Sequence, residues 1–188
     1  MRRILLPCLL LLLLTSRGHA QGDIERRGAW GMFAIGAGSA GVDCGFCEGN
    51  RAWGPSGMVA FGGTPSRRVL VGGGASGIAK TAGDTDTYLG WALGLVRAYP
   101  SASLGVFVSG GAGVGYGRGT SSADAFDALG AGFLVGLGWD FGLGPSLGVT
   151  AIANFLLTAG GYLKQNDVQA SGSFNPTLFQ FGLGVTMF

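Results

Sequence analysis

Large apolar residues alternate with small ones along the segment from Leu129 to Leu157. Before a break at 142–145, the bulky set includes Phe133 and Val135, and the residues between are mostly glycine. After the break, the same two-residue period resumes. A period of two places successive side chains on opposite faces of a β-strand. The pattern therefore predicts a hairpin with one bulky apolar face and one small or polar face.

Eight segments of this kind follow one another along the chain. We expect strands near Trp30–Ala37, Gly57–Gly63, Arg68–Ile78, Thr87–Arg97, Leu104–Gly117, Ala128–Phe141, Ser146–Thr158 and Thr177–Phe188. Short connections containing proline alternate with longer ones, which are expected at 38–55, 79–86, 118–127 and 159–176. Short turns on one side and long loops on the other are typical of outer-membrane barrels, with the long loops outside the cell.

The face opposite the bulky residues carries almost no charge, and Asp140 is its clearest acid. A water-facing surface of this size would carry many charged side chains. A transmembrane barrel gives its apolar face to lipid and hides its other face in a narrow lumen. We therefore expect an all-β, eight-stranded antiparallel up-and-down transmembrane barrel rather than a secreted soluble β-protein. The same rule places the bulky set from Leu89 to Leu95 in the fourth segment on the lipid side.

Glycine is unusually common, at 39 of 188 residues. Many glycines fall on the face that we assign to the lumen: Gly105, Gly111, Gly113, Gly115, Gly130, Gly132, Gly136, Gly138, Gly148, Gly182 and Gly184. Two explanations remain open. Glycine allows strands to curl tightly around inward fillers, for which the candidates are Phe107, Leu134, Ile152 and Leu156. Alternatively, the lumen has spare volume that water or an apolar ligand must fill.

The first 20 residues have the form of a secretory signal peptide. Two arginines precede the apolar run from Ile4 to Leu14, and small residues at 18–20 favour cleavage after Ala20. We expect a periplasmic leader at 21–27 and the barrel domain at 28–188. Residues 21–188 keep nine of the twelve basic residues and all ten acidic residues, a net charge of −1. With no long basic run, a nucleic-acid partner is not expected.

The segments RRVLVGGG, AYPSASLGVFVSGGAGVGYG and LFQFGLGVTMF resemble small bacterial outer-membrane β-barrel proteins of the porin-like outer membrane β-barrel domain family. The resemblance covers the whole chain after the signal peptide. It implies a location in the bacterial outer membrane, with outer-membrane lipid and the outer-membrane assembly machinery as partners. It also implies that Phe188 is part of the signal that this machinery reads. Phe188 is nevertheless out of phase with the outward set that ends at Met187.

The sequence contains only partial matches to catalytic, cofactor-binding or metal-binding motifs. The segment 36–41 fits G-x-G-x-x-G, but neither the helix nor the acidic residue of a dinucleotide site follows. Cys44 and Cys47 form C-x-x-C, and two ligands are too few for a zinc site, so a local disulfide in an oxidising compartment is expected. The only histidine, His19, leaves with the signal peptide. We therefore expect no cofactor, no metal and no enzyme activity.

Three functions remain open from the sequence. The first is a structural or surface-interaction barrel that presents four extracellular loops, whose partner the sequence does not identify. The alternative is a barrel that holds a small apolar or lipid-like ligand in its lumen or mouth. The third is a narrow passive pore. It is the least favoured of the three, because an eight-stranded lumen is wide enough only for side chains or one small ligand. Ser109, Asp140 and Asn154 are interpreted as polar lumen residues rather than catalysts.

Overall fold

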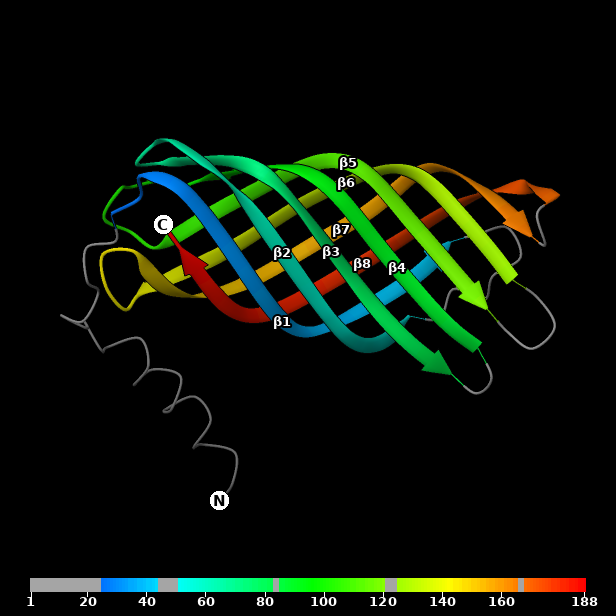
Figure 1. Cartoon of the computed structure of the whole chain (residues 1–188). Coiled ribbons are helices and arrows are strands. Elements are labelled where there is room, and N and C mark those ends of the chain that lie inside the picture. The colour runs from blue at the N-terminus through cyan, green and yellow to red at the C-terminus, as the bar shows by residue number, and fades with distance from the viewer. Residues whose placement is uncertain (1–24, 44–50, 83–84, 121–124, 166–167) are drawn as a thin grey trace, which may run out of the picture.

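The computed structural model describes residues 25–43, 51–82, 85–120, 125–165 and 168–188. Its eight strands are β1 (Gly28–Asp43), β2 (Ala52–Ser66), β3 (Val69–Ala82), β4 (Thr85–Ala98), β5 (Val106–Thr120), β6 (Ala125–Gly142), β7 (Leu147–Gln165) and β8 (Val168–Met187). Each strand pairs antiparallel with the next, and β8 pairs with β1 to close the barrel (Figure 1). The all-β fold class and the strand order expected from the sequence are confirmed.

The start of β1 and the C-terminus lie at the same end of the barrel, together with the β2–β3, β4–β5 and β6–β7 connections (Figure 1). This end is called the periplasmic end below, following the orientation predicted from the sequence, and the opposite end is called the extracellular end. Within the described residues, no helix is long and apolar enough to span a membrane.

The strands run further toward the extracellular end than the sequence pattern indicated. β7 continues to Gln165 and β8 begins at Val168, so most of the loop expected at 159–176 is paired strand. The strands have 14 to 20 residues, whereas about 9–11 suffice to cross a membrane. Beyond the hydrocarbon layer, the apolar alternation is no longer required, although the backbone ladder continues. The sequence pattern therefore ends before the strand does.

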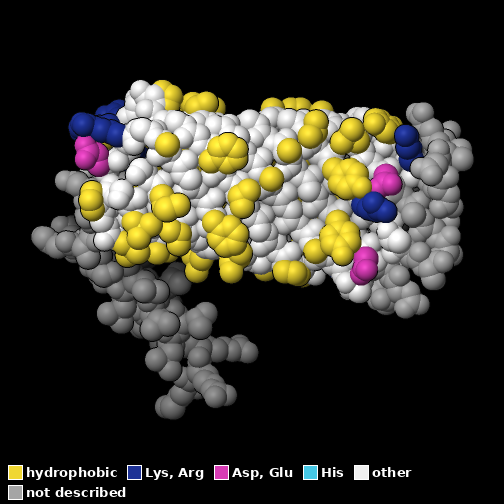
Figure 2. Space-filling view, in the orientation of Figure 1, with side chains coloured by type: hydrophobic (Ala, Val, Ile, Leu, Met, Phe, Trp, Pro, Cys, Tyr) yellow, Lys and Arg dark blue, Asp and Glu magenta, His cyan; other side chains and the backbone are white. Residues whose placement is uncertain are grey.

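The outer wall is apolar on most strands. Phe133 is 43% exposed and Val135 is 61% exposed, whereas Leu134 between them is buried. The same outward orientation holds for bulky residues of other strands: Phe33, Ile35, Val59, Phe61, Leu137, Trp139, Phe141, Phe179, Phe181, Leu183 and Val185. In Figure 2 the charged side chains gather at the two ends, and the wall between them shows hydrophobic side chains and uncharged surface. The predicted lipid face of β6 and β8 is confirmed.

Strand β4 contradicts the expected orientation. Leu89, Trp91, Leu93 and Leu95 are each no more than 5% exposed and point into the lumen, while the residues between them form the outer face. An eight-stranded barrel must fill its interior with side chains. Because the inward face of β6 is largely glycine, another strand has to supply the bulk, and β4 supplies it.

The inward glycines of β5 and β6 lie beneath these fillers. A Cβ atom on Gly111 would lie 2.7 Å from Leu95 Cδ2, and one on Gly115 would lie 2.9 Å from Trp91 Nε1. A Cβ atom on Gly138 would overlap the Phe107 ring. The four predicted fillers, Phe107, Leu134, Ile152 and Leu156, are all buried. These contacts favour the first explanation for the glycines, in which they make room for bulky groups inside a tightly curved wall.

Candidate functional site

The middle of the lumen holds a small polar network. Ser76 donates its hydroxyl hydrogen to Gln180 Oε1 at 3.0 Å, and Asn154 donates its amide hydrogen to the same oxygen at 3.3 Å. All three side chains are buried. Buried polar groups are stable when they satisfy one another. The network therefore links β3, β7 and β8 across the barrel, and Asn154 lies in the lumen as the sequence predicted.

A second polar cluster lies nearer the periplasmic end, around Asp140. The Tyr99 hydroxyl donates to Asp140 Oδ2 at 2.7 Å, and the Thr150 hydroxyl donates to Asp140 Oδ1 at 2.6 Å. Thr150 also shares a hydrogen bond with Thr186. Asp140 is fully buried, so each of these hydrogen bonds replaces one that water would make. The arrangement fits a structural role, as expected for Asp140 from the sequence.

Arg97, which no sequence motif singled out, is 2% exposed inside the lumen. Its guanidinium lies 5.0 Å from the centre of the Trp30 ring and 4.5 Å from that of Phe107, and it contacts the sulfur of Met32. Aromatic faces stabilise a buried cation through their negative potential. A signal was present in the sequence, because Arg97 continues the alternation of Leu89 to Leu95. Arg97 is buried, so the face that it shares with Leu89 to Leu95 is the lumen face.

Arg26 closes the periplasmic mouth, and it too was missed because it precedes the first strand. It is 3% exposed and donates to two backbone carbonyls of the β4–β5 connection, Ala102 at 2.9 Å and Leu104 at 3.2 Å. Its guanidinium lies 3.8 Å from the Tyr99 ring centre and 5.7 Å from that of Phe188. These two carbonyls lie 76 and 78 residues further along the chain than Arg26, so the local sequence pattern could not predict the contact.

Phe188 follows the end of β8 and packs partly buried against the lumen residues. Its backbone amide donates to the carbonyl of Ser146 at 2.9 Å. This inward position agrees with its being out of phase with Met187, which is 61% exposed. The predicted role of Phe188 in assembly stays a prediction.

Two other predicted features have different outcomes. Ser109 lies on the inward face of β5, and its hydroxyl oxygen would be 2.7 Å from a Cβ atom on Gly136. Cys44 and Cys47 lie outside the described residues, so the disulfide stays a prediction. In the part of the chain that the structure describes, no three potential metal ligands lie together.

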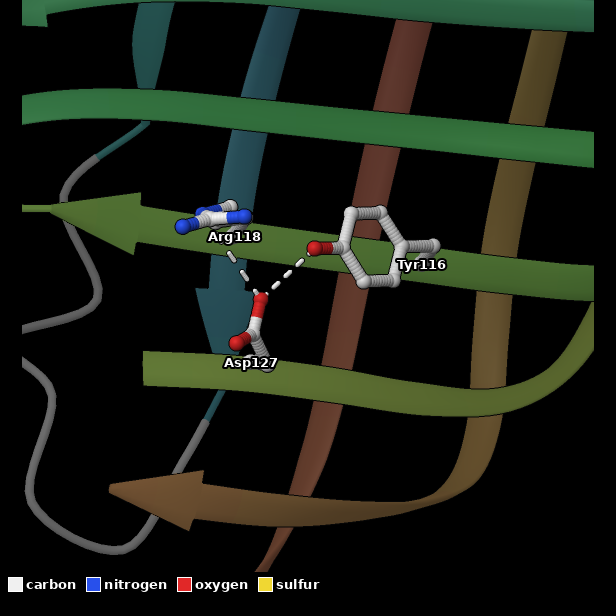
Figure 3. Close-up of polar contacts among 3 residues, drawn as sticks. All are labelled: Tyr116, Arg118 and Asp127. Atoms are coloured by element: carbon white, nitrogen blue, oxygen red, sulfur yellow. Dashed lines mark hydrogen bonds and ion pairs between the residues drawn. The ribbon is translucent and has the colours of Figure 1, made fainter. Parts of the chain in front are cut away.

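The extracellular end carries exposed charge on the outer wall. Arg51 donates to Thr177 Oγ1 at 2.9 Å and lies 4.8 Å from the centre of the Phe179 ring. On β5 and β6, the Tyr116 hydroxyl donates to Asp127 Oδ1 at 2.6 Å, and Arg118 Nε lies 3.9 Å from the same oxygen (Figure 3). Charged and aromatic side chains at the extracellular end are suited to the lipid headgroup region, where a side chain contacts apolar lipid on one side and water on the other.

Three solved structures are similar to the chain over most of its length. Ail, the attachment invasion locus protein of Yersinia pestis, is 15% identical with a TM-score of 0.52 over 85% of this chain and 99% of that one. Neisserial surface protein A (NspA) is 16% identical with a TM-score of 0.52, over 85% and 98%. The chain has the fold of a small outer-membrane β-barrel.

The outer membrane protein OprG of Pseudomonas aeruginosa is also similar, at 11% identity and a TM-score of 0.50 over 88% of this chain and 98% of that one. No protein-family profile and no curated protein sequence matches the chain. At these identities the likeness is one of fold. The fold and the apolar wall agree with the predicted location in the bacterial outer membrane, where closed sheets with an outward apolar band cross the lipid.

Proposed function

We propose that the protein is a closed outer-membrane barrel with a structural or surface-interaction role, presenting its extracellular loops to the surroundings of the cell. The observation that carries this proposal is the filled lumen. Bulky residues from β1, β4, β5, β6 and β7 are buried inside it, and Arg26 covers its periplasmic mouth. The barrel wall therefore serves as a rigid support for what the extracellular end displays.

The filled interior counts against a passive pore and against a ligand held in the lumen. A pore requires a continuous water-filled path, and here the inward positions of β4 carry Leu89, Trp91, Leu93, Leu95 and Arg97. A lumen ligand requires unoccupied volume, whereas the inward glycines lie against neighbouring side chains and backbone. The proposal includes no catalytic step.

Conductance measurements test whether the barrel is closed. The purified protein, inserted into planar bilayers, should give no stepwise current. Arg26→Ala should also give no stepwise current, because the residues deeper in the lumen still fill it when the periplasmic mouth is uncovered. Stepwise current from the wild-type protein would contradict the proposal.

The orientation is tested by the lysines. The chain after the signal peptide contains only Lys80 and Lys164, both toward the extracellular end. A membrane-impermeant amine reagent applied to intact cells should modify the exposed Lys164, as judged by mass spectrometry of the purified protein. Modification only after cell lysis would show that this end faces the periplasm.

A further inference from the structure

A shallow groove of about 450 Å³ lies on the outer wall across β2 to β5. Its floor consists of Gly57, Gly77 and Gly90, which are register partners on three adjacent strands. Tyr88 and Tyr116, which are 51% and 40% exposed, form part of its sides. The glycines lower the wall to the level of the backbone, so the groove is a furrow in a surface that otherwise faces lipid.

Charged residues adjoin the groove at its tyrosine side. The Tyr116 hydroxyl donates to Asp127, which lies beside Arg118 (Figure 3). Arg118 is the register partner of Tyr88 on one side and of Asp127 on the other, and Lys164 is the next partner along the same row. Two cations thus flank a single carboxylate. The row carries a net positive charge, and its Arg118 end adjoins the furrow at Tyr88.

We propose that the groove holds an acyl chain of a phosphate-bearing membrane lipid, and that Arg118 binds the lipid's phosphate. A narrow apolar furrow matches the shape of a single chain, and the adjoining positive row matches the charge of the phosphate. Arginine forms charge-assisted hydrogen bonds with phosphate oxygens. A second copy of this face fits less well, because two hollows do not fill each other.

The physical basis of this binding is shape and charge. Lipid tails are as apolar as the groove, so burial of the tail supplies no hydrophobic driving force within a membrane. The glycine floor allows a chain to contact the backbone closely, and dispersion contacts grow with such close approach. Asp127 accepts a hydrogen bond from Tyr116 and pairs weakly with Arg118, whose side chain stays 55% exposed. Arg118 is therefore placed near the groove and remains free to meet a phosphate.

The proposal rests on the membrane location in the proposed function, and lipid retention in native mass spectrometry tests it separately from conductance. The protein, folded in detergent, is titrated with dipalmitoyl phosphatidylglycerol and, in parallel, with dipalmitoylglycerol, which lacks the phosphate. Retention of phosphatidylglycerol should be about threefold higher, the size expected of one half-exposed charge pair. Equal retention of the two lipids would overturn the assignment of Arg118.

Gly90→Leu is the variant that fills the groove. A Cβ atom on Gly90 has its nearest contact at 3.9 Å, so the side chain enters the furrow without disturbing the backbone. Gly94→Leu is the matched control, because Gly94 lies on the same face of β4 outside the groove and its Cβ would have its nearest contact at 3.7 Å. Retention of both lipids should fall about threefold in Gly90→Leu and stay unchanged in Gly94→Leu. An equal effect of the two variants would refute the groove as the binding site.

Arg118→Gln should reduce phosphatidylglycerol retention to the level of dipalmitoylglycerol, and should leave dipalmitoylglycerol unaffected. Excess inorganic phosphate should not displace phosphatidylglycerol, since the acyl chain holds the lipid in place. Displacement by phosphate alone would show an anion site without a role for the groove. Folding of each variant is checked by heat-modifiable gel mobility. If Gly90→Leu does not fold, Gly57→Leu replaces it, because a Cβ atom there has its nearest contact at 3.6 Å.

Discussion

Strands β4 and β6 carry the same alternation of bulky and small residues, and the barrel uses it in opposite directions. On β6, Phe133 and Val135 face outward and glycines face the lumen. On β4, Trp91 and Leu93 face the lumen, and small residues such as Gly94 form the outer wall. Alternation thus identifies a strand with two unlike faces. It does not say which face is inside, because lipid and a packed lumen both accept bulky apolar groups.

The largest expected difference between the two strands concerns their tryptophans. Trp91 is 2% exposed and donates to the Leu157 carbonyl at 3.3 Å, whereas Trp139 is 45% exposed and stacks on Phe141 at the outer wall. Trp91→Ala should cost about 3–5 kcal/mol of unfolding free energy because it leaves a cavity. Trp139→Ala should cost about 1 kcal/mol or less, since lipid or detergent fills the space. Urea titrations of both variants in lipid vesicles measure this, and equal costs would contradict the inverted facing of β4.

An arginine substitution on the outer wall tests whether the bulky face of β6 contacts lipid. Phe133→Arg, toward the middle of β6, should lower the unfolding free energy by roughly 2–4 kcal/mol because the cation is placed in hydrocarbon. Phe141→Arg lies one residue before the end of the same strand, on the same face, and should cost about 0–1 kcal/mol. Refolding titrations in lipid distinguish the two. A negligible cost at Phe133 would place that residue away from lipid.

In both strands, the ionisable residue nearest the periplasmic end is buried in the lumen. Asp140 falls in phase with the glycines of β6, and Arg97 falls in phase with the bulky residues of β4. Both side chains are buried, so each lies on the lumen face of its own strand. The expected orientation of β4 rested on the alternation alone, and the burial of Leu89, Trp91 and Arg97 contradicts it.

Other features depend on contacts that no local pattern contains. Arg26 covers the mouth because the closed barrel brings the β4–β5 connection to it. The groove depends on the register that aligns Gly57, Gly77 and Gly90 across three strands. Strand number, order and the apolar wall follow from the two-residue period and the turn signals. Cross-barrel contacts and side-by-side alignment require the register itself.

The smallest expected difference compares the same substitution at two glycines. A Cβ atom on Gly132 would lie 2.7 Å from the backbone carbon of Val114, while one on Gly94 would have its nearest contact at 3.7 Å. Gly132→Leu should therefore overpack the lumen and cost on the order of 1–3 kcal/mol. Gly94→Leu adds its side chain on the lipid side and should change the unfolding free energy by no more than about 0.5 kcal/mol. Unfolding titrations in lipid vesicles measure both variants. If Gly132→Leu proved neutral or stabilising, the lumen would have spare volume next to β6, and the ligand-holding barrel would become the better account of the glycine face.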